Sequence, residues 1–147
     1  MSGETIEVWG TTPKVLESAG TGFASGSLVP ASNTYDKIVD GGGYPDGQFI
    51  LAATFNTAPV ENSLISLYVR EYAMDGSGVR TDAPETTRPG RQIGSFQVND
   101  RTASQPMILT VNDLPAKADY YLHNNGTGQA VAAGWKLTVV PRSYKSA

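Results

Sequence analysis

The stretch Ser63-Leu-Ile-Ser-Leu-Tyr-Val-Arg-Glu71 decides the fold class of this chain. Its odd positions from 65 to 69 are apolar, whereas the even positions carry Ser66, Tyr68 and Arg70. Alternation with a period of two, in a run rich in β-branched and aromatic residues, predicts a half-buried β-strand.

The same kind of pattern recurs on both sides of this stretch, and no segment has helical spacing over three turns. We expect a bulge near Gly94-Ser95, a hairpin turn at Asn124–Gly128, and an end to the last strand at Pro141. The strands expected besides 63–71 are Thr5–Trp9, Tyr35–Val39, Gln48–Phe55, Arg91–Val98, Gln105–Val111, Asp119–His123 and Trp135–Val139. Short strands separated by frequent turns predict an all-β fold, a single β-sandwich or jelly-roll domain.

The first 34 residues differ from the rest because their apolar pieces are short and set among Ser, Gly and Thr. We therefore predict an extended N-terminal arm over residues 1–34 and a sandwich domain over residues 35–147. Trp9 and Phe23 favour an arm that orders against a neighbouring subunit, and a disordered terminus is the alternative. On this interpretation, removal of residues 2–30 leaves the domain folded.

Composition limits the function. The 147 residues contain no cysteine, which excludes disulfides and thiolate metal sites, and the net charge is only −3. So small a charge does not indicate a nucleic-acid or membrane partner. The start, MSGETIEVW, lacks the basic and apolar regions of a secretory signal, so none is expected. Residues 73–90 form a long polar stretch that predicts a functional or mobile loop.

Candidate catalytic groups are few. His123 is the only histidine, so one chain cannot supply a multi-histidine metal site. A Ser–His–Asp arrangement with Asp119 is formally possible, but no G-x-S-x-G motif occurs. The carboxylates are dispersed, and Asp75-Gly-Ser-Gly lacks the spacing of a calcium loop. We expect no enzyme activity, no cofactor and no metal.

Several stretches resemble the small cement, or decoration, proteins that bind the outside of phage capsids. The resemblance covers about residues 35–144 and is carried by these segments: Ser63–Arg70, Ile93–Val98, Leu114-Pro115, Tyr120–Ala130 and Gly134–Tyr144. It implies a β-sandwich or jelly roll that forms dimers or trimers on the capsid exterior, after assembly in the host cytoplasm. It also implies contact with the major capsid protein and no catalytic residues.

On this hypothesis the arm and the long loop, which are free to reach neighbours, supply the partner contacts. The candidate contact residues are Ile6, Val8, Trp9, Phe23, Leu28, Arg80, Arg88 and Arg91. The alternative is a carbohydrate- or receptor-binding module of a phage tail or surface protein. Its candidate rings for stacking on sugars are Tyr68, Tyr72, Tyr121 and Trp135.

Overall fold

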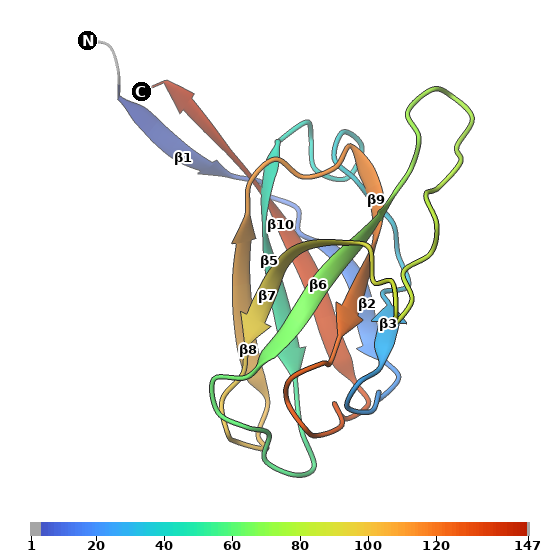
Figure 1. The fold of residues 1–147 in the computed structure, drawn as a ribbon. Helices are drawn as coiled ribbons and strands as arrows, with labels where there is room; N and C mark the ends of the chain where they lie inside the picture. Colours follow the sequence, from blue (N-terminus) through green and yellow to red (C-terminus); the bar gives the residue numbers. More distant parts are fainter. Residues whose placement is uncertain (1–3, 147) are drawn as a thin grey trace.

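Two antiparallel β-sheets lie face to face and form the body of the protein (Figure 1). The computed structural model describes residues 4–146, and this part contains no helix that could cross a membrane. The strands are β1 Thr5–Trp9, β2 Lys14–Gly20, β3 Leu28–Pro30, β4 Tyr35–Asp36, β5 Asp46–Ala53, β6 Leu64–Glu71, β7 Arg91–Gln97, β8 Gln105–Val111, β9 Lys117–His123 and β10 Trp135–Ser146.

The strand order is that of a jelly roll. One sheet runs β2-β10-β5-β8, with β1 added beside the far end of β10, and the other runs β9-β6-β7, with β3 and β4 both beside β9. Early strands pair with late ones: β2 with β10, β3 and β4 with β9, β5 with β8, and β6 with β7. A long hairpin rolled into two sheets has this pairing, so the predicted all-β sandwich is confirmed.

The alternating residues of the strands fill the space between the sheets. Phe49 and Leu51 of β5 face inward from one sheet, and Leu67 of β6 and Tyr120 of β9 from the other. The rings of Phe49 and Tyr120 lie 4.9 Å apart and join the two layers at the centre. β6 and β7 lose register between Leu67 and Tyr68, which leaves Ile93 as the bulged residue next to the predicted position.

Trp135 requires a glycine opposite it at the other end of the core. Its indole lies against Gly20 of β2, where an added Cβ would overlap the ring, and its Nε1 donates to the carbonyl of Thr21 at 2.8 Å. Buried indoles need such an acceptor, because an unpaired N–H is costly away from water. Residues 20 and 21 are therefore part of the core wall.

An extended arm over residues 1–34 is not confirmed. β2 pairs with β10, β3 pairs with β9, and the side chains of Leu16 and Phe23 are buried in the core. Only β1 lies beyond the body of the sandwich (Figure 1). Removal of residues 2–30 would take three strands, β1, β2 and β3, out of the sheets, so the structure argues against the expectation that the rest folds without them.

The prediction of a hairpin at Asn124–Gly128 is also wrong. β9 and β10 belong to different sheets, so the chain crosses between the layers here. Asn124 is buried, donates to the carbonyl of Gln129 at 2.7 Å and accepts a hydrogen bond from the hydroxyl of Thr127. The asparagine holds a crossover loop instead of opening a two-residue turn.

Two strand ends differ from the sequence-based expectation. β4 stops at Asp36, because residues 37–43 form consecutive turns. β10 continues through Pro141 to Ser146. The carbonyl oxygen of Pro141 accepts a hydrogen bond from the backbone N–H of Gly10. In an antiparallel pair the nitrogen and the carbonyl of one residue point to the same side, so the proline nitrogen also faces residues 10–13, between β1 and β2. No strand lies there that would need an N–H donor.

Candidate interaction surface

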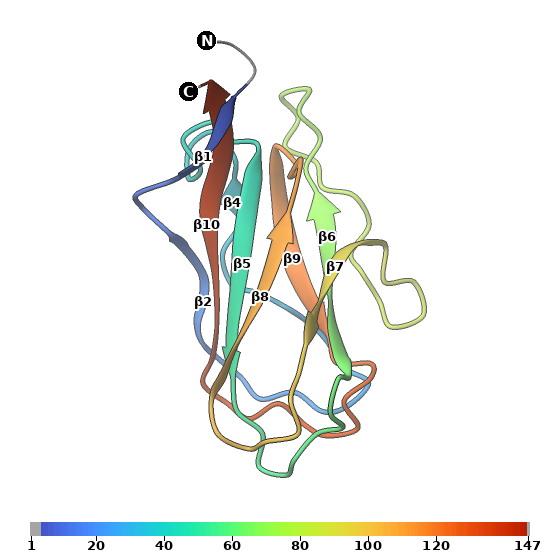
Figure 2. The same ribbon diagram turned by 90° about the vertical axis from the view of Figure 1, so that its left-hand side faces the viewer.

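A two-stranded ribbon extends beyond the sandwich at one end (Figures 1 and 2). It consists of β1 paired with residues 142–146 of β10, and we call it the terminal ribbon. Three of its large side chains are exposed: Ile6 by 45%, Trp9 by 39% and Tyr144 by 52%. A lone ribbon of two strands is marginally stable in water, so its base must be fastened to the body.

Arg142 fastens the ribbon. Its Nη1 donates to Glu7 Oε1 at 3.1 Å, and its Nη2 donates to Asn112 Oδ1 and lies 3.8 Å from Asp46 Oδ2. The guanidinium also lies 5.9 Å from the ring centre of Trp9 and 5.2 Å from that of Tyr144. One buried cation therefore ties both ribbon strands to β5 and to the turn after β8.

A rigid turn at the same end presents two apolar side chains to solvent. Ile38 is 64% exposed and Val39 is 80% exposed. The carboxylate of Asp36 accepts from the backbone N–H of both, at 2.9 and 3.0 Å, and Lys37 Nζ donates to the carbonyl of Leu114 at 2.8 Å. The turn is held from both sides, so the two side chains project from a fixed backbone.

The long loop over residues 73–90, which was predicted from the sequence, begins at this end (Figure 1). Met74 and Val79 are exposed there. Arg80 ties the loop to the second sheet, because its Nη1 lies 2.8 Å from Asp119 Oδ2 and its guanidinium lies over the ring of Tyr72. The hydrogen bond to Asp119 raises the pKa of Arg80.

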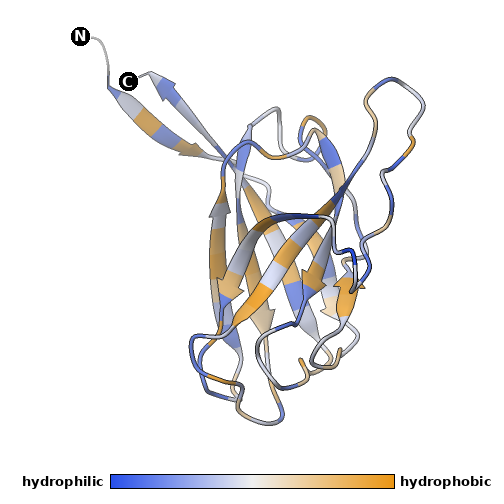
Figure 3. Cartoon of the chain, in the orientation of Figure 1, coloured by the Kyte–Doolittle hydropathy of each residue, from blue (hydrophilic) through white to orange (hydrophobic). Residues whose placement is uncertain are grey.

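Most of the exposed large apolar side chains lie toward one end of the sandwich, on these three separate elements, and we call this end the ribbon end. Seven of the ten among the described residues lie there, and β1 and the long loop both carry apolar colour in Figure 3. The seven are Ile6, Trp9, Ile38, Val39, Met74, Val79 and Tyr144. A concentration of exposed apolar side chains toward one end of a molecule makes that end a candidate contact surface.

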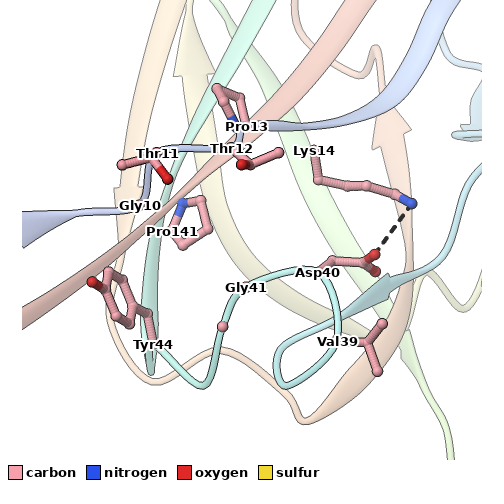
Figure 4. A pocket seen from close by; sticks show the side chains of 11 residues that line it. Gly10, Thr11, Thr12, Pro13, Lys14, Val39, Asp40, Gly41, Tyr44 and Pro141 are labelled. Carbon is pink, nitrogen blue, oxygen red and sulfur yellow. Dashed lines mark ion pairs between the residues drawn. The ribbon is translucent and has the colours of Figure 1, made fainter.

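A cavity of about 490 Å³ opens beside the ribbon base, between residues 10–14 and 39–44 (Figure 4). The Nζ atom of Lys14 lies 3.3 Å from a carboxylate oxygen of Asp40 across it. Tyr44 and Pro141 supply apolar walls. The only cation and the only carboxylate lining this cavity neutralise each other.

The arrangement of His123 with Asp119 that the sequence left formally possible is not formed in residues 4–146. Asp119 accepts from Arg80 and from Thr34 Oγ1, and it is separated from His123 by about 13 Å along β9 at ordinary strand rise. No group of three or more His, Asp or Glu side chains that could hold a metal occurs in this described part. Burial raises the pKa of Tyr35 to about 12 and also raises that of Tyr120, which keeps both phenols neutral.

The rings considered for sugar stacking do not form a platform. Trp135 and Tyr68 are buried, and the face of Tyr72 lies against Arg80 and Lys117, whose charged groups are 5.5 and 4.8 Å from the ring centre. Tyr121 is half-buried, and among the described residues it is the one ring of the four that is neither buried nor packed against a cationic side chain. This arrangement does not favour a carbohydrate site.

The structure separates the predicted contact residues. Ile6, Val8 and Trp9 lie together on β1. Phe23 is a core residue that bridges to Val131, and Leu28 pairs with His123 inside the second sheet. The arginines are also apart: Arg80 holds the loop, Arg88 lies 3.7 Å from Glu85 in the loop, and Arg91 pairs with Glu71 beside β7.

Sequence reasoning missed Ile38, Val39, Arg142 and Tyr144. The first two were expected inside a strand, and the last two lie beyond a proline that was expected to end one. Thr5–Trp9 carries one acidic residue, Glu7, and Arg142–Ser146 carries two basic residues, Arg142 and Lys145. This opposite charge was the available signal that the two segments pair.

Searches with this chain against protein-family models, curated proteins and solved structures found no match.

Proposed function

We propose that this chain is a virion structural protein that decorates a phage capsid and cements it by clamping neighbouring major capsid subunits. The observation that carries the proposal is the gathering of exposed apolar side chains at the ribbon end. Three separate elements present these side chains: the terminal ribbon, the rigid turn and the long loop. A contact surface of this shape suits a partner that is itself a large assembly.

The rigidity of the body supports the same function. A clamp must transmit force between the molecules it joins, so the surface it presents must be held from behind. Asp36 holds the rigid turn, Arg80 holds the loop, and Arg142 holds the ribbon. Each apolar contact is therefore presented at low entropic cost, which favours binding.

Repetition on an icosahedral shell strengthens modest contacts. A self-associated cement protein touches several capsid subunits at once, and each added contact then forms within one complex. Homo-oligomerisation, as dimers or trimers, belongs to this proposal. It places the protein on the capsid exterior after assembly in the host cytoplasm.

Co-sedimentation with empty capsids of the encoding phage tests the function. We expect saturable binding of the full chain, and at least tenfold weaker binding for the double variant Ile38→Ser/Val39→Ser. The matched control is Val60→Ser, since Val60 is similarly exposed, at 63%, and belongs to the connection between β5 and β6, which lies at the opposite end (Figure 1). A folded chain that does not bind capsids, or equal losses in both variants, would contradict the proposal.

A further inference from the structure

Within the described residues, 4–146, both edges of the terminal ribbon carry backbone groups without a strand partner. Gly10 N donates to the carbonyl of Pro141 at 2.7 Å, which makes Gly10 and Pro141 a hydrogen-bonded pair. In an antiparallel ladder such pairs alternate with pairs whose backbone groups point outward. The outward groups of β1 therefore belong to Thr5, Glu7 and Trp9.

The opposite edge is open over the last residues of β10. By the same alternation, Arg142, Tyr144 and Ser146 point their backbone groups away from β1. β5 covers Arg142, because Asp46, its first residue, pairs there. Within residues 4–146, no strand continues beside Tyr144 and Ser146. Open edges of this kind are templates for pairing with another chain.

The two edges differ in charge. Glu4, just before β1, and Glu7 give the β1 edge acidic character, and Lys145 is the base on the open part of the β10 edge. Arg142 and Glu7 already pair with each other inside one ribbon, so Glu4 and Lys145 are the charges free to act between copies. Pairing β1 with a second β1 would place acids beside acids, and pairing β10 with a second β10 would place bases beside bases. Like charges across strands destabilise, so the favourable partner for each edge is the other kind of edge.

We propose that copies of this chain assemble through the terminal ribbon, with the β1 edge of one copy pairing with the β10 edge of the next. Each copy then uses its β1 edge in one contact and its β10 edge in another. A contact between two different surfaces generates a closed ring or an open filament, and closure removes every free edge of the ribbons.

Strand direction agrees with this assembly. β1 and β10 are antiparallel within one ribbon. When ribbons are related by rotation about an axis roughly parallel to them, β10 of one copy and β1 of the next are again antiparallel. The ring would continue one ladder through all copies, with Ile6 and Val8 gathered on the same face.

This inference specifies the self-association that the proposed function includes, so it rests on that proposal only in part. It is tested with the chain alone, and a failed assembly is therefore a separate result from failed capsid attachment. Because the chain contains no cysteine, disulfide cross-linking cannot produce a false oligomer.

Native mass spectrometry and sedimentation velocity across a concentration series provide the first test. We expect the wild-type chain to form a ring of discrete mass. Tyr144→Pro removes a backbone N–H that points away from β1, so the hydrogen bonds between β10 and β1 stay intact. This variant should raise the dissociation constant of the oligomer at least tenfold. Tyr144→Thr keeps that N–H and removes the ring, so it should weaken assembly less than Tyr144→Pro.

Charge reversal provides the second test and does not depend on a proline being tolerated. Lys145→Glu and Glu4→Lys should each weaken assembly about fivefold, the size expected for like charges across strands, and the double variant should restore it. A wild-type chain that stays monomeric at all concentrations would overturn the proposal. So would an oligomer whose mass and affinity are unchanged by Tyr144→Pro and by each charge reversal.

Discussion

The guanidinium of Arg142 donates a hydrogen bond to the carboxylate of Glu7 across the terminal ribbon, with 3.1 Å between Nη1 and Oε1. Arg142 is buried, while the ribbon it holds is exposed. The contact lies at the point where β10 leaves the sandwich, and it converts a marginal pair of strands into a fixed projection.

Replacement of this arginine should loosen the protein. We expect Arg142→Ala to lower the free energy of unfolding by about 3 kcal/mol, because the buried carboxylate of Asp46 loses its neighbouring cation and the ribbon loses its anchor. Urea unfolding followed by fluorescence measures this change. Arg101→Ala, in an exposed turn, is the matched control and should change stability by less than about 0.5 kcal/mol. Equal effects of the two substitutions would refute the role given to Arg142.

The close approach of Gly20 to Trp135 gives a second expectation. Gly20→Ala places a Cβ inside the space of the indole and should cost about 2–3 kcal/mol of unfolding free energy, since the ring cannot move without breaking its bond to Thr21. Ser18→Ala, exposed on the same strand, serves as the control for thermal and urea unfolding. Full stability of Gly20→Ala would show that the indole has room to move.

Alkaline pH should destabilise the fold through Tyr35. Burial, followed by the charges of Asp40 and Asp36, raises the pKa of this phenol from 10.0 to about 12 in the folded state. The unfolded chain loses the proton first, so the stabilisation present below pH 10 is lost as the pH rises toward 12. The loss for this group is about 2–3 kcal/mol at 1.36 kcal/mol per pKa unit.

Urea unfolding at pH 9 to 12 measures the effect of this tyrosine. The Tyr35 hydroxyl has no hydrogen-bond partner, so Tyr35→Phe should fold normally at pH 7 and lose less stability with rising pH. Tyr44→Phe, at a half-buried tyrosine, is the control and should retain the wild-type slope. If the slope is the same in Tyr35→Phe, Tyr35 is not the group that titrates.

The long loop should open when its anchor is removed. Arg80→Ala breaks the contacts with Asp119 and Tyr72, and hydrogen exchange should then become faster at the amide of Thr81, which donates to the carbonyl of Glu71 at 2.8 Å. Global stability should change less than local exchange, because Arg80 is itself largely exposed and Asp119 keeps the hydrogen bond from Thr34. Arg88→Ala in the same loop should leave exchange at Thr81 unchanged. Slow exchange in both variants would mean that the loop is held by other contacts.

The sequence predicted the strands with the clearest alternation and the long polar loop, because local patterning determines both. The alternation around Leu67 correctly predicted a strand at β6, but the expectation that this strand is half-buried is wrong. Ser66 and Tyr68 on its other face are also buried, because β6 is a central strand between β9 and β7. The order of the strands in each sheet could not be predicted from local patterning, because it depends on which strand from the first half of the chain pairs with which strand from the second half. The pairing of Lys14–Gly20 with β10 is such a case, because a short apolar pattern becomes a strand only beside its partner.

The ribbon end was predicted only in part for a related reason. Ile6, Val8 and Trp9 formed a visible strand pattern, but their partner strand lies after Pro141. A proline is compatible with a strand when its nitrogen faces a gap between neighbours, and only the three-dimensional arrangement shows that gap. Ile38 and Val39 were similarly assigned to a strand, whereas the carboxylate of Asp36 fixes them in a turn.

The temperature at which empty capsids of the encoding phage open, measured with and without this protein, tests the central claim most directly. The account predicts that saturating full-length chain raises that temperature by several degrees, and that Ile38→Ser/Val39→Ser at equal concentration does not, while Val60→Ser behaves as wild type. An unchanged opening temperature with a folded wild-type protein present would contradict the account.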